Sequence, residues 1–296
     1  MSSIQLVGSL QRSASFNGAF RRLGAVALLA LLAGCEGDIT VDMTTERPTD
    51  PTITQVVVNV RGLEFTGGTG TETLEFTNSQ QLDLMDYADD TNMLRLFTDE
   101  QLSEGRYTGV RLLIDADDND DALVALSDGS TLPVTVIQGD YAPVDFEFED
   151  NESNSESLTL MLDLRQSLSF DDGDDEYTFT PVLRAVHSEE ISRIEGNLAV
   201  TCPAGDSLGT GAVYLFQGRN ITPDDLDGQG IEPFATAPVF TSPFFYSLRV
   251  LPEGTYTLAV TCIGNDEDPA TDEDLEFRNV VNVELDESEV LDLDLP

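Results

Sequence analysis

Apolar and polar residues alternate in many short segments of the chain, and a longer helical period is hard to find. Short alternating runs that are separated by Gly, Asp, Asn and Pro clusters are typical of β-strands. In the first part of the chain these runs are ITVDMT (39–44), ITQVVVNV (53–60), TLEF (73–76), QLDLMD (81–86), YTGVRLLI (107–114), TLPVTVI (131–137), VDFEFE (144–149), LTLMLDL (158–164) and YTFTPVLRAV (177–186). The segment DDTNMLRLF (89–97) is the one plausible helical turn, with Thr91 as its candidate cap.

A second series of short strands begins near Ile191. It comprises RIEGNLAV (193–200), GAVYLFQG (211–218), FFYSLRVL (244–251), TYTLAVTC (255–262), LEFRNVVNVEL (275–285) and EVLDLDL (289–295). Two such series predict an all-β protein of two tandem Greek-key sandwiches of the immunoglobulin or transthyretin-like kind. We place these domains at 39–187 and 191–296, with the boundary in HSEEIS (187–192).

A similar turn sequence occurs twice, as LSEGRYTG beginning at residue 102 and as LPEGTYTL beginning at residue 251. Greek-key sandwiches use a Leu, a Gly-bearing turn and a Tyr as a tyrosine corner, in which the Tyr hydroxyl bonds to main chain upstream. The repeat therefore predicts one tyrosine corner in each domain, at Tyr107 and Tyr256. In the first copy Gly109 falls on the face of Tyr107, and a β-bulge at this glycine would restore the register.

The first 34 residues contain no acidic residue, and they combine three arginines with the apolar run LGAVALLALLAG. This is the pattern of a secretory signal peptide, because the run is too short for a stable transmembrane helix. It ends in LLAGC, which resembles a bacterial lipobox. We therefore expect cleavage after Gly34, acyl chains (diacylglycerol and palmitate) on Cys35, and a short tether at 35–38. Glu36 after the cysteine favours the outer over the inner membrane.

Charge narrows the set of partners. The chain has 56 acidic and 14 basic residues, every basic one is Arg, and the formal net charge is −42. Nucleic acid and anionic membrane surfaces repel such a chain, so we expect no nucleic-acid partner. Apolar residues make up 40%, which is enough for a core, so the acidity belongs to a solvated surface. The composition suits a marine or halophilic habitat, and a set of calcium sites is the alternative interpretation.

Several pieces of the first domain together resemble a known family. They are DMTTERPTDP, VVVNV, LDLMDY, LSEGRYTGVRLLID and YTFTPVLRAV. As a set they resemble the bacterial lipoprotein domain of unknown function 4382, over about residues 39–187. The aspartate that the family carries in its first loop is replaced here by TER. Residues 191–296 resemble carboxypeptidase-regulatory or transthyretin-like sandwiches. Neither resemblance implies a catalytic residue.

Signals for catalysis are scarce. The single histidine, His187, follows a strand at the expected domain boundary, where a solvated role is more common than catalysis. Nucleophile-elbow, zinc-protease and P-loop motifs do not occur in the sequence. We therefore expect a protein without enzymatic activity. A hydrolase is the less favoured alternative, and it would need a cleft lined by converging carboxylates.

No cofactor is predicted, but calcium binding by an acidic loop remains an alternative. DADDNDDALVAL (115–126) begins like an EF-hand loop, and its candidate ligands are Asp115, Asp117, Asn119 and Asp121. The loop lacks the turn glycine and the bidentate glutamate, so it is not an EF-hand. The runs DDGDDE (171–176) and NDEDPATDEDLE (265–276) could also hold a hard cation, although a solvated loop is the more common structure. PVFTSPFFY (238–246) is the one dense aromatic patch, and adjacent strand residues face opposite ways, so one ring could face a partner or the other domain.

LAVTC occurs twice, at 198–202 and 258–262. With Cys35 reserved for lipid, Cys202 and Cys262 remain in an oxidising compartment, where pairing is the default. The sequence thus predicts a disulfide between them. As a whole it predicts a lipid-anchored envelope protein with a binding or structural role, whose partner is an unknown envelope protein or polysaccharide. A calcium- or glycan-binding adhesion module is the alternative.

Overall fold

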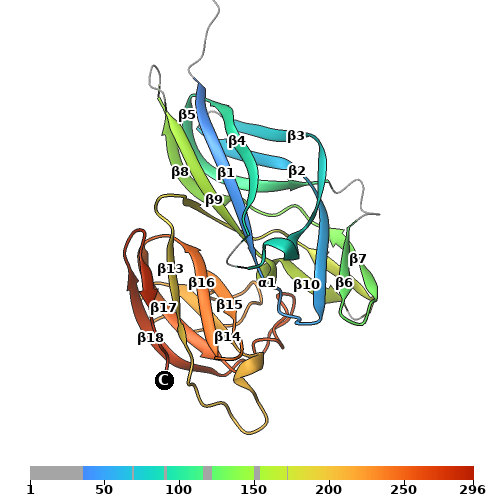
Figure 1. Cartoon of the computed structure of the whole chain (residues 1–296), viewed down its shortest axis with the longest axis vertical. Coiled ribbons are helices and arrows are strands. Elements are labelled where there is room, and N and C mark those ends of the chain that lie inside the picture. The colour runs from blue at the N-terminus through green and yellow to red at the C-terminus, as the bar shows by residue number, and fades with distance from the viewer. Residues whose placement is uncertain (1–35, 69, 90–91, 116–121, 150–153, 172) are drawn as a thin grey trace, which may run out of the picture. The chain divides into compact units, whose positions relative to one another are not determined.

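Strands form nearly all of the regular structure in the computed structural model, as the alternating pattern predicts (Figure 1). The structure describes residues 36–68, 70–89, 92–115, 122–149, 154–171 and 173–296. Cys35 and the expected signal peptide lie outside these residues. None of the helices in the described ranges is long and apolar enough to span a membrane.

Residues 36–187, here called the N-terminal half, form two sheets. Sheet I has the strand order β12-β9-β1-β4, and sheet II has the order β10-β11-β7-β6-β2-β5-β8 with β3 added on β2. The strands are β1 (Glu36–Glu46), β2 (Ile53–Gly67), β3 (Gly70–Asp83), β4 (Leu94–Ser103), β5 (Gly105–Ile114), β6 (Leu123–Leu126), β7 (Thr131–Val136), β8 (Ala142–Phe148), β9 (Ser155–Asp163), β10 (Leu168–Asp171), β11 (Glu176–Phe179) and β12 (Leu183–His187).

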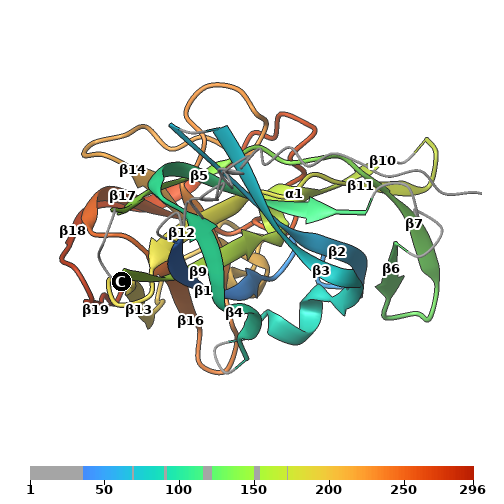
Figure 2. The ribbon, with the colours of Figure 1, turned by 90° about the horizontal axis from the view of Figure 1, so that it is seen from above.

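Residues 192–296, the C-terminal half, form two further sheets. Sheet III has the order β16-β13-β19, and sheet IV has the order β15-β14-β17-β18. The strands are β13 (Ser192–Asn197), β14 (Ala212–Gln217), β15 (Ala235–Pro238), β16 (Phe245–Leu251), β17 (Gly254–Thr261), β18 (Phe277–Leu285) and β19 (Val290–Asp292). Figure 2 shows the same strands from above, with β12 beside its partner β9.

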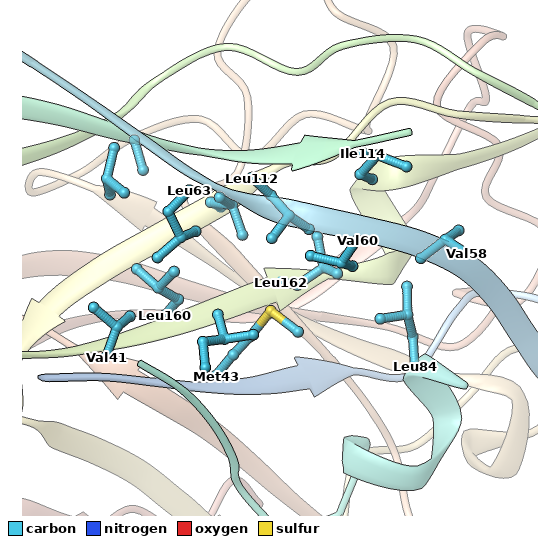
Figure 3. Close-up of a cluster of buried hydrophobic side chains, with 14 of the residues drawn as sticks. Val41, Met43, Val58, Val60, Leu63, Leu84, Leu112, Ile114, Leu160 and Leu162 are labelled. Atoms are coloured by element: carbon cyan, nitrogen blue, oxygen red, sulfur yellow. The ribbon is translucent and has the colours of Figure 1, made fainter. Parts of the chain in front are cut away.

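The core of the N-terminal half lies between sheets I and II. Figure 3 shows apolar side chains of β1 and β9 pointing toward those of β2 and β5. Along β2, Val56, Val58 and Val60 are buried, and after a register shift the buried positions continue at Leu63 and Phe65. The shift keeps the apolar residues of this long strand on one face, because it adds one residue to the alternation.

Both predicted tyrosine corners are confirmed. The hydroxyl of Tyr256 donates to the carbonyl oxygen of Pro252 at 2.9 Å, and the hydroxyl of Tyr107 lies 2.9 Å from the carbonyl oxygen of Ser103. The register of β5 shifts between Tyr107 and Gly109, as the predicted bulge requires. The repeated sequence therefore encodes the same turn in both halves.

The predicted helical turn at 89–97 is wrong. Leu94 begins β4, which pairs with β1, and Thr91 lies outside the described residues. A short 3-10 helix does form just upstream, at Leu84–Tyr87, where the side chain of Asp83 caps it. Pairing with β1 gives this segment more hydrogen bonds than an isolated helical turn would, so tertiary context overrides the local pattern. Elsewhere in the described residues, helical turns form at α1 (Leu164–Ser167) and at a 3-10 helix over Leu208–Thr210.

The predicted disulfide is present. Cys202 and Cys262 are bonded, and their Cα atoms lie 5.8 Å apart. Cys262 follows β17 and is buried in the core of the C-terminal half, while Cys202 packs against the same core. The bridge therefore ties the chain that leaves β13 to the strand of the tyrosine corner.

Arginine side chains of each half donate hydrogen bonds to backbone carbonyl oxygens of the other half. Arg184 of β12 donates through Nη2 to the carbonyl oxygen of Arg249 at 3.1 Å. Arg249 of β16 donates back to the carbonyl oxygens of Asp89 at 2.7 Å and Thr45 at 2.8 Å. These bonds are charge-assisted, and those to Arg249 and Thr45 are partly buried, which makes them stronger than ordinary surface bonds. They position the C-terminal half directly beside β12.

Candidate binding groove beside strand β12

A groove of about 540 Å³ lies along β12. Its lining includes Leu183, Ala185 and His187 of β12, so the strand itself forms part of the surface. β12 is the edge strand of sheet I, because it pairs with β9 alone among the described strands. The groove is thus built on a sheet edge.

The two sides of the groove come from different parts of the chain. Pro143, Val144 and Asp145 of β8 line one side. Phe234 and Pro252, together with Gln217, come from the C-terminal half and line the other. Most of these side chains are apolar, so this part of the groove would bury an apolar ligand surface.

The groove continues past His187 into an acidic cavity of about 620 Å³. Its carboxylates and hydroxyls are Asp99, Asp145, Glu156, Glu189, Glu190, Thr40, Ser155 and Ser157. Asp145 is paired with Arg106 at 2.7 Å on the exposed face of β5 and β8. The acidic cavity and the apolar groove share Asp145, His187 and Glu190, which makes them one continuous surface with a cation-attracting end.

His187 stands where the apolar and acidic parts meet. Its Nδ1 lies 3.2 Å from Oε2 of Glu156 on β9, and its Nε2 lies 3.3 Å from the carbonyl oxygen of Asp145 on β8. The ring also packs edge-on against Phe146. Both ring nitrogens are therefore engaged in linking three strands. This arrangement is a structural bridge rather than a base poised against a nucleophile.

A family model matches residues 36–181, and its description is Domain of unknown function (DUF4382). Residues 36–181 are a DUF4382 domain. The match begins at β1 and ends just before β12, so it covers most of both sheets of the N-terminal half. It confirms the family predicted from the repeated turn and its neighbouring strands. The likeness of residues 191–296 to carboxypeptidase-regulatory or transthyretin-like sandwiches stays a prediction.

Comparison with other proteins adds little to the DUF4382 match. No curated protein matches the chain. Among solved structures, the Bacillus anthracis TIE protein is 10% identical at a TM-score of 0.22, and the match covers 88% of this chain but 34% of that one. A candidate adhesin from Bacteroides ovatus is 11% identical at a TM-score of 0.20, with 96% and 99% of the two chains covered. Likenesses this weak carry no argument about this chain.

Other predicted site residues of the DUF4382 domain lie away from the groove or outside the described residues. Asp115 is described, and it accepts a hydrogen bond from the Ser79 hydroxyl at 3.0 Å. Asp117, Asn119 and Asp121 lie outside the described residues, so the calcium prediction at this loop stays a prediction. Cys35 also lies outside them.

In the C-terminal half the structure brings together carboxylates from two loops. Oxygen atoms of Asp225, Glu267 and Glu273 lie within 4.8 Å of one another, and Asp227 and Asp272 form a second such group with Asp225. Glu267 is only 3% exposed, and burial raises its pKa to about 7. Burial also raises the pKa of Asp225. The acidic run at 265–276 showed half of this cluster in the sequence, but the partner loop around Asp225 gave no signal.

The aromatic patch at 238–246 is divided by the fold. Tyr246 is buried, and its hydroxyl donates to the carbonyl oxygen of Leu293 at 2.8 Å. Phe240 and Phe244 are 39% and 40% exposed. Phe240 lines a cavity together with Arg47 and Pro48, which connect β1 to β2 in the DUF4382 domain. One ring of the patch therefore faces the other half, as the alternation of strand residues allowed.

Proposed function

We propose that this protein is a lipid-anchored, non-catalytic binding protein of the bacterial cell envelope, and that the groove beside β12 is its binding site. The single observation that carries the binding role is the groove itself, in which an apolar stretch on a sheet edge joins an acidic cavity at His187. The partner is an envelope protein. Polysaccharide is less favoured, because the groove offers one aromatic ring, Phe234, as a stacking surface.

Anchoring is supported by the start of the chain and by the redox state of the cysteines. The lipobox-like LLAGC places Cys35 directly before β1, the first described strand. The disulfide between Cys202 and Cys262 suits the oxidising conditions outside the cytoplasm. Two or more acyl chains would make the attachment durable, whereas a single chain gives marginal binding.

We expect Cys35→Ser to abolish lipid attachment and signal cleavage. The serine hydroxyl cannot take the thioether-linked lipid, so a full-length precursor should accumulate. Metabolic labelling with a fatty acid, followed by membrane fractionation, measures the effect. Cys202→Ser is the matched control, and it should keep both lipid and processing. Normal labelling of the Cys35 variant would refute the anchor.

The binding role is tested by site-specific photocrosslinking in cells. A photoreactive amino acid at Pro143, which is exposed and lines the groove, should capture a reproducible partner. The same amino acid at Val280, which is 48% exposed on β18, is the control and should not. Equal capture at both positions, or none at Pro143, would count against the groove as the binding site.

Calcium binding at Asp225 is a second candidate function. It is favoured by the approach of three carboxylates whose oxygens lie within 4.8 Å of one another. Burial raises the pKa of Asp225 and Glu267, which shows that their charged forms are destabilised in the protein alone. A hard cation would relieve that cost and is normally bound by such oxygen ligands.

We expect the melting temperature to rise with NaCl, because screening weakens the mutual repulsion of a chain with a net charge of −42. Calcium at Asp225 predicts an additional rise with CaCl₂ over NaCl of matched ionic strength. Asp225→Asn should remove that additional rise, and Asp128→Asn, on an exposed turn, should not. Identical curves for the two salts would eliminate the second candidate. A melting temperature that falls with NaCl would refute the screening argument.

A further inference from the structure

The backbone of β12 has a regular alternation that decides which of its groups face the groove. In an antiparallel pair, the N–H and C=O of one residue point toward the partner strand and those of the next residue point away. Two hydrogen bonds fix the phase here. The amide of Asp163 donates to the carbonyl oxygen of Val182 at 3.0 Å, and the amide of Ser188 donates to the carbonyl oxygen of Ser157 at 2.8 Å. Even-numbered residues of β12 therefore bond to β9.

It follows that Leu183, Ala185 and His187 direct their backbone groups away from β9. All three line the groove, as do Arg184 and Val186, whose backbone groups bond to β9. The carbonyl oxygen of His187 accepts from the amide of Glu190 at 2.9 Å. Within the described residues, nothing bonds to the amides of Leu183, Ala185 and His187. The carbonyl oxygens of Leu183 and Ala185 also lack a partner there. Five backbone groups in a row are thus left for a ligand, and a strand edge of this kind is a template for pairing with another chain.

Strand β8 on the opposite side is protected against such pairing. Asp145 turns its carbonyl oxygen to His187. Pro143, which precedes Asp145 within the register shift of β8, has no N–H to donate. Asp145 and Glu147 add exposed charges along β8. The chain therefore blocks one edge beside the groove and leaves the other open.

We infer that the groove binds an extended polypeptide segment of the partner, which adds to β12 as a fifth strand of sheet I. This inference rests on the proposed binding role of the groove. Strand addition gives affinity through main-chain bonds and specificity through alternate side chains. Val144, Phe234 and Pro252 would contact apolar side chains of the segment. Asp145 and Glu190 would attract a lysine or arginine where the groove meets the acidic cavity.

Charge complementarity selects this occupant over a second copy of the chain. With 56 acidic and 14 basic residues, two copies repel each other, and acidic side chains would meet acidic side chains at His187. A basic, alternating segment from another envelope protein meets neither obstacle. The predicted ligand is therefore a polypeptide with alternating apolar residues and a basic residue at one end.

The probe is the synthetic peptide acetyl-Lys-Val-Thr-Val-Thr-Val-amide, titrated into ¹⁵N-labelled protein to about 1 mM, a concentration suited to weak binding. We expect its addition to shift the amide resonances of Leu183, Ala185 and His187. Two further peptides are N-methylated. The first carries the methyl groups on its three Val amides, and the second carries them on its two Thr amides. A strand pairs through one edge only, so one analogue should lose about tenfold or more in affinity and the other should stay within about twofold.

A pair of protein variants makes the same distinction. Ala185→Pro removes the amide that points into the groove and leaves the ladder to β9 intact, as an edge strand tolerates. Ala185→Val keeps that amide and adds similar volume. We expect the proline variant to weaken peptide binding by about tenfold and the valine variant to bind like the wild type. A circular dichroism spectrum and melting temperature show that the variants remain folded.

Equal binding of both N-methylated peptides, or equal binding of both Ala185 variants, would overturn strand addition. Shifts at β12 that depend on protein concentration without peptide would instead identify a second copy as the occupant. Absence of peptide binding, with capture of a partner at Pro143 still present, would refute the strand while the proposed binding role stands. Absence of capture at Pro143 would refute the proposed role itself.

Discussion

Replacing both Cys202 and Cys262 by alanine is expected to lower the free energy of unfolding by about 4 kcal/mol. The bridge closes a loop with a sequence separation of 60 residues. In the chain-entropy account, its loss gives the unfolded chain conformations that the crosslink had excluded. The loop holds β14, β15, β16 and β17, so three of the four strands of sheet IV lose this constraint. Chemical denaturation of the two proteins measures the difference.

Reductant gives an independent control for the disulfide. Adding it to the wild type should produce nearly the same loss of stability, and the double variant should not respond to it. Alanine is preferred to serine because Cys262 is buried, and a serine hydroxyl there would add its own desolvation cost. A loss below about 1 kcal/mol would show that the unfolded chain is already restrained without the bridge.

The second large effect concerns pH and arises from Glu46 at the junction of the two halves. The carboxyl group is 2% exposed, and its Oε2 lies 3.7 Å from Nη2 of Arg249 without a hydrogen-bond partner among the described residues. Burial raises its pKa from 4.5 to about 7, and the charge of Arg249 opposes the shift in part. The folded state therefore holds a proton that the unfolded chain releases near pH 4.5.

The sign of the effect follows from that extra proton. A raised folded-state pKa stabilises the protein fully below the unfolded value, and the stabilisation is lost as the pH rises through the folded value. Between about pH 4.5 and 7, Glu46 should lower the free energy of unfolding by about 3 kcal/mol as the pH increases. Glu46→Gln should flatten this part of the curve, because glutamine stays neutral.

The matched control is Glu75→Gln on β3, where the carboxylate is 48% exposed and pairs with Arg61. Its curve should keep the shape of the wild type. Denaturation at several pH values gives the three curves, and the difference between wild type and Glu46→Gln isolates this group from other acids that titrate nearby. Superimposable curves for these two proteins would refute the predicted role of Glu46.

Local features of the fold could be predicted from the sequence. Both tyrosine corners were visible because the Leu, Gly and Tyr that form them lie within a few residues of each other. The disulfide followed from counting, since only two cysteines remain after Cys35. The strand that begins at Leu94 was missed, because its pairing with β1 is a long-range contact that the local pattern does not contain.

The groove could not be predicted for the same physical reason. β9 pairs with β12 on one side and with β1, in parallel, on the other, which leaves β12 at the edge of the sheet. The pairing of β9 with β1 joins segments more than 100 residues apart. Alternation marks a strand but says nothing about which neighbours it has. His187 was identified as the only histidine, yet its place at the junction of two cavities depends on β8, β9 and β12 together. The excess of acidic residues in the sequence predicted an acidic surface, but it did not show that acidic side chains gather at one end of the groove.

The position of β1 also has a mechanical consequence. This strand lies inside sheet I, parallel to β9 along its length and antiparallel to β4 on the other side. A pull on its amino end, where a membrane tether would attach, acts along the strand and loads both hydrogen-bond ladders in shear. Many bonds must then break together, whereas a strand peeled from an edge loses them one at a time. The resistance of the domain to such a pull is set by its unfolding rate under force. A pull on the amino end of the DUF4382 domain would thus be resisted by hydrogen-bond ladders on both sides of its first strand.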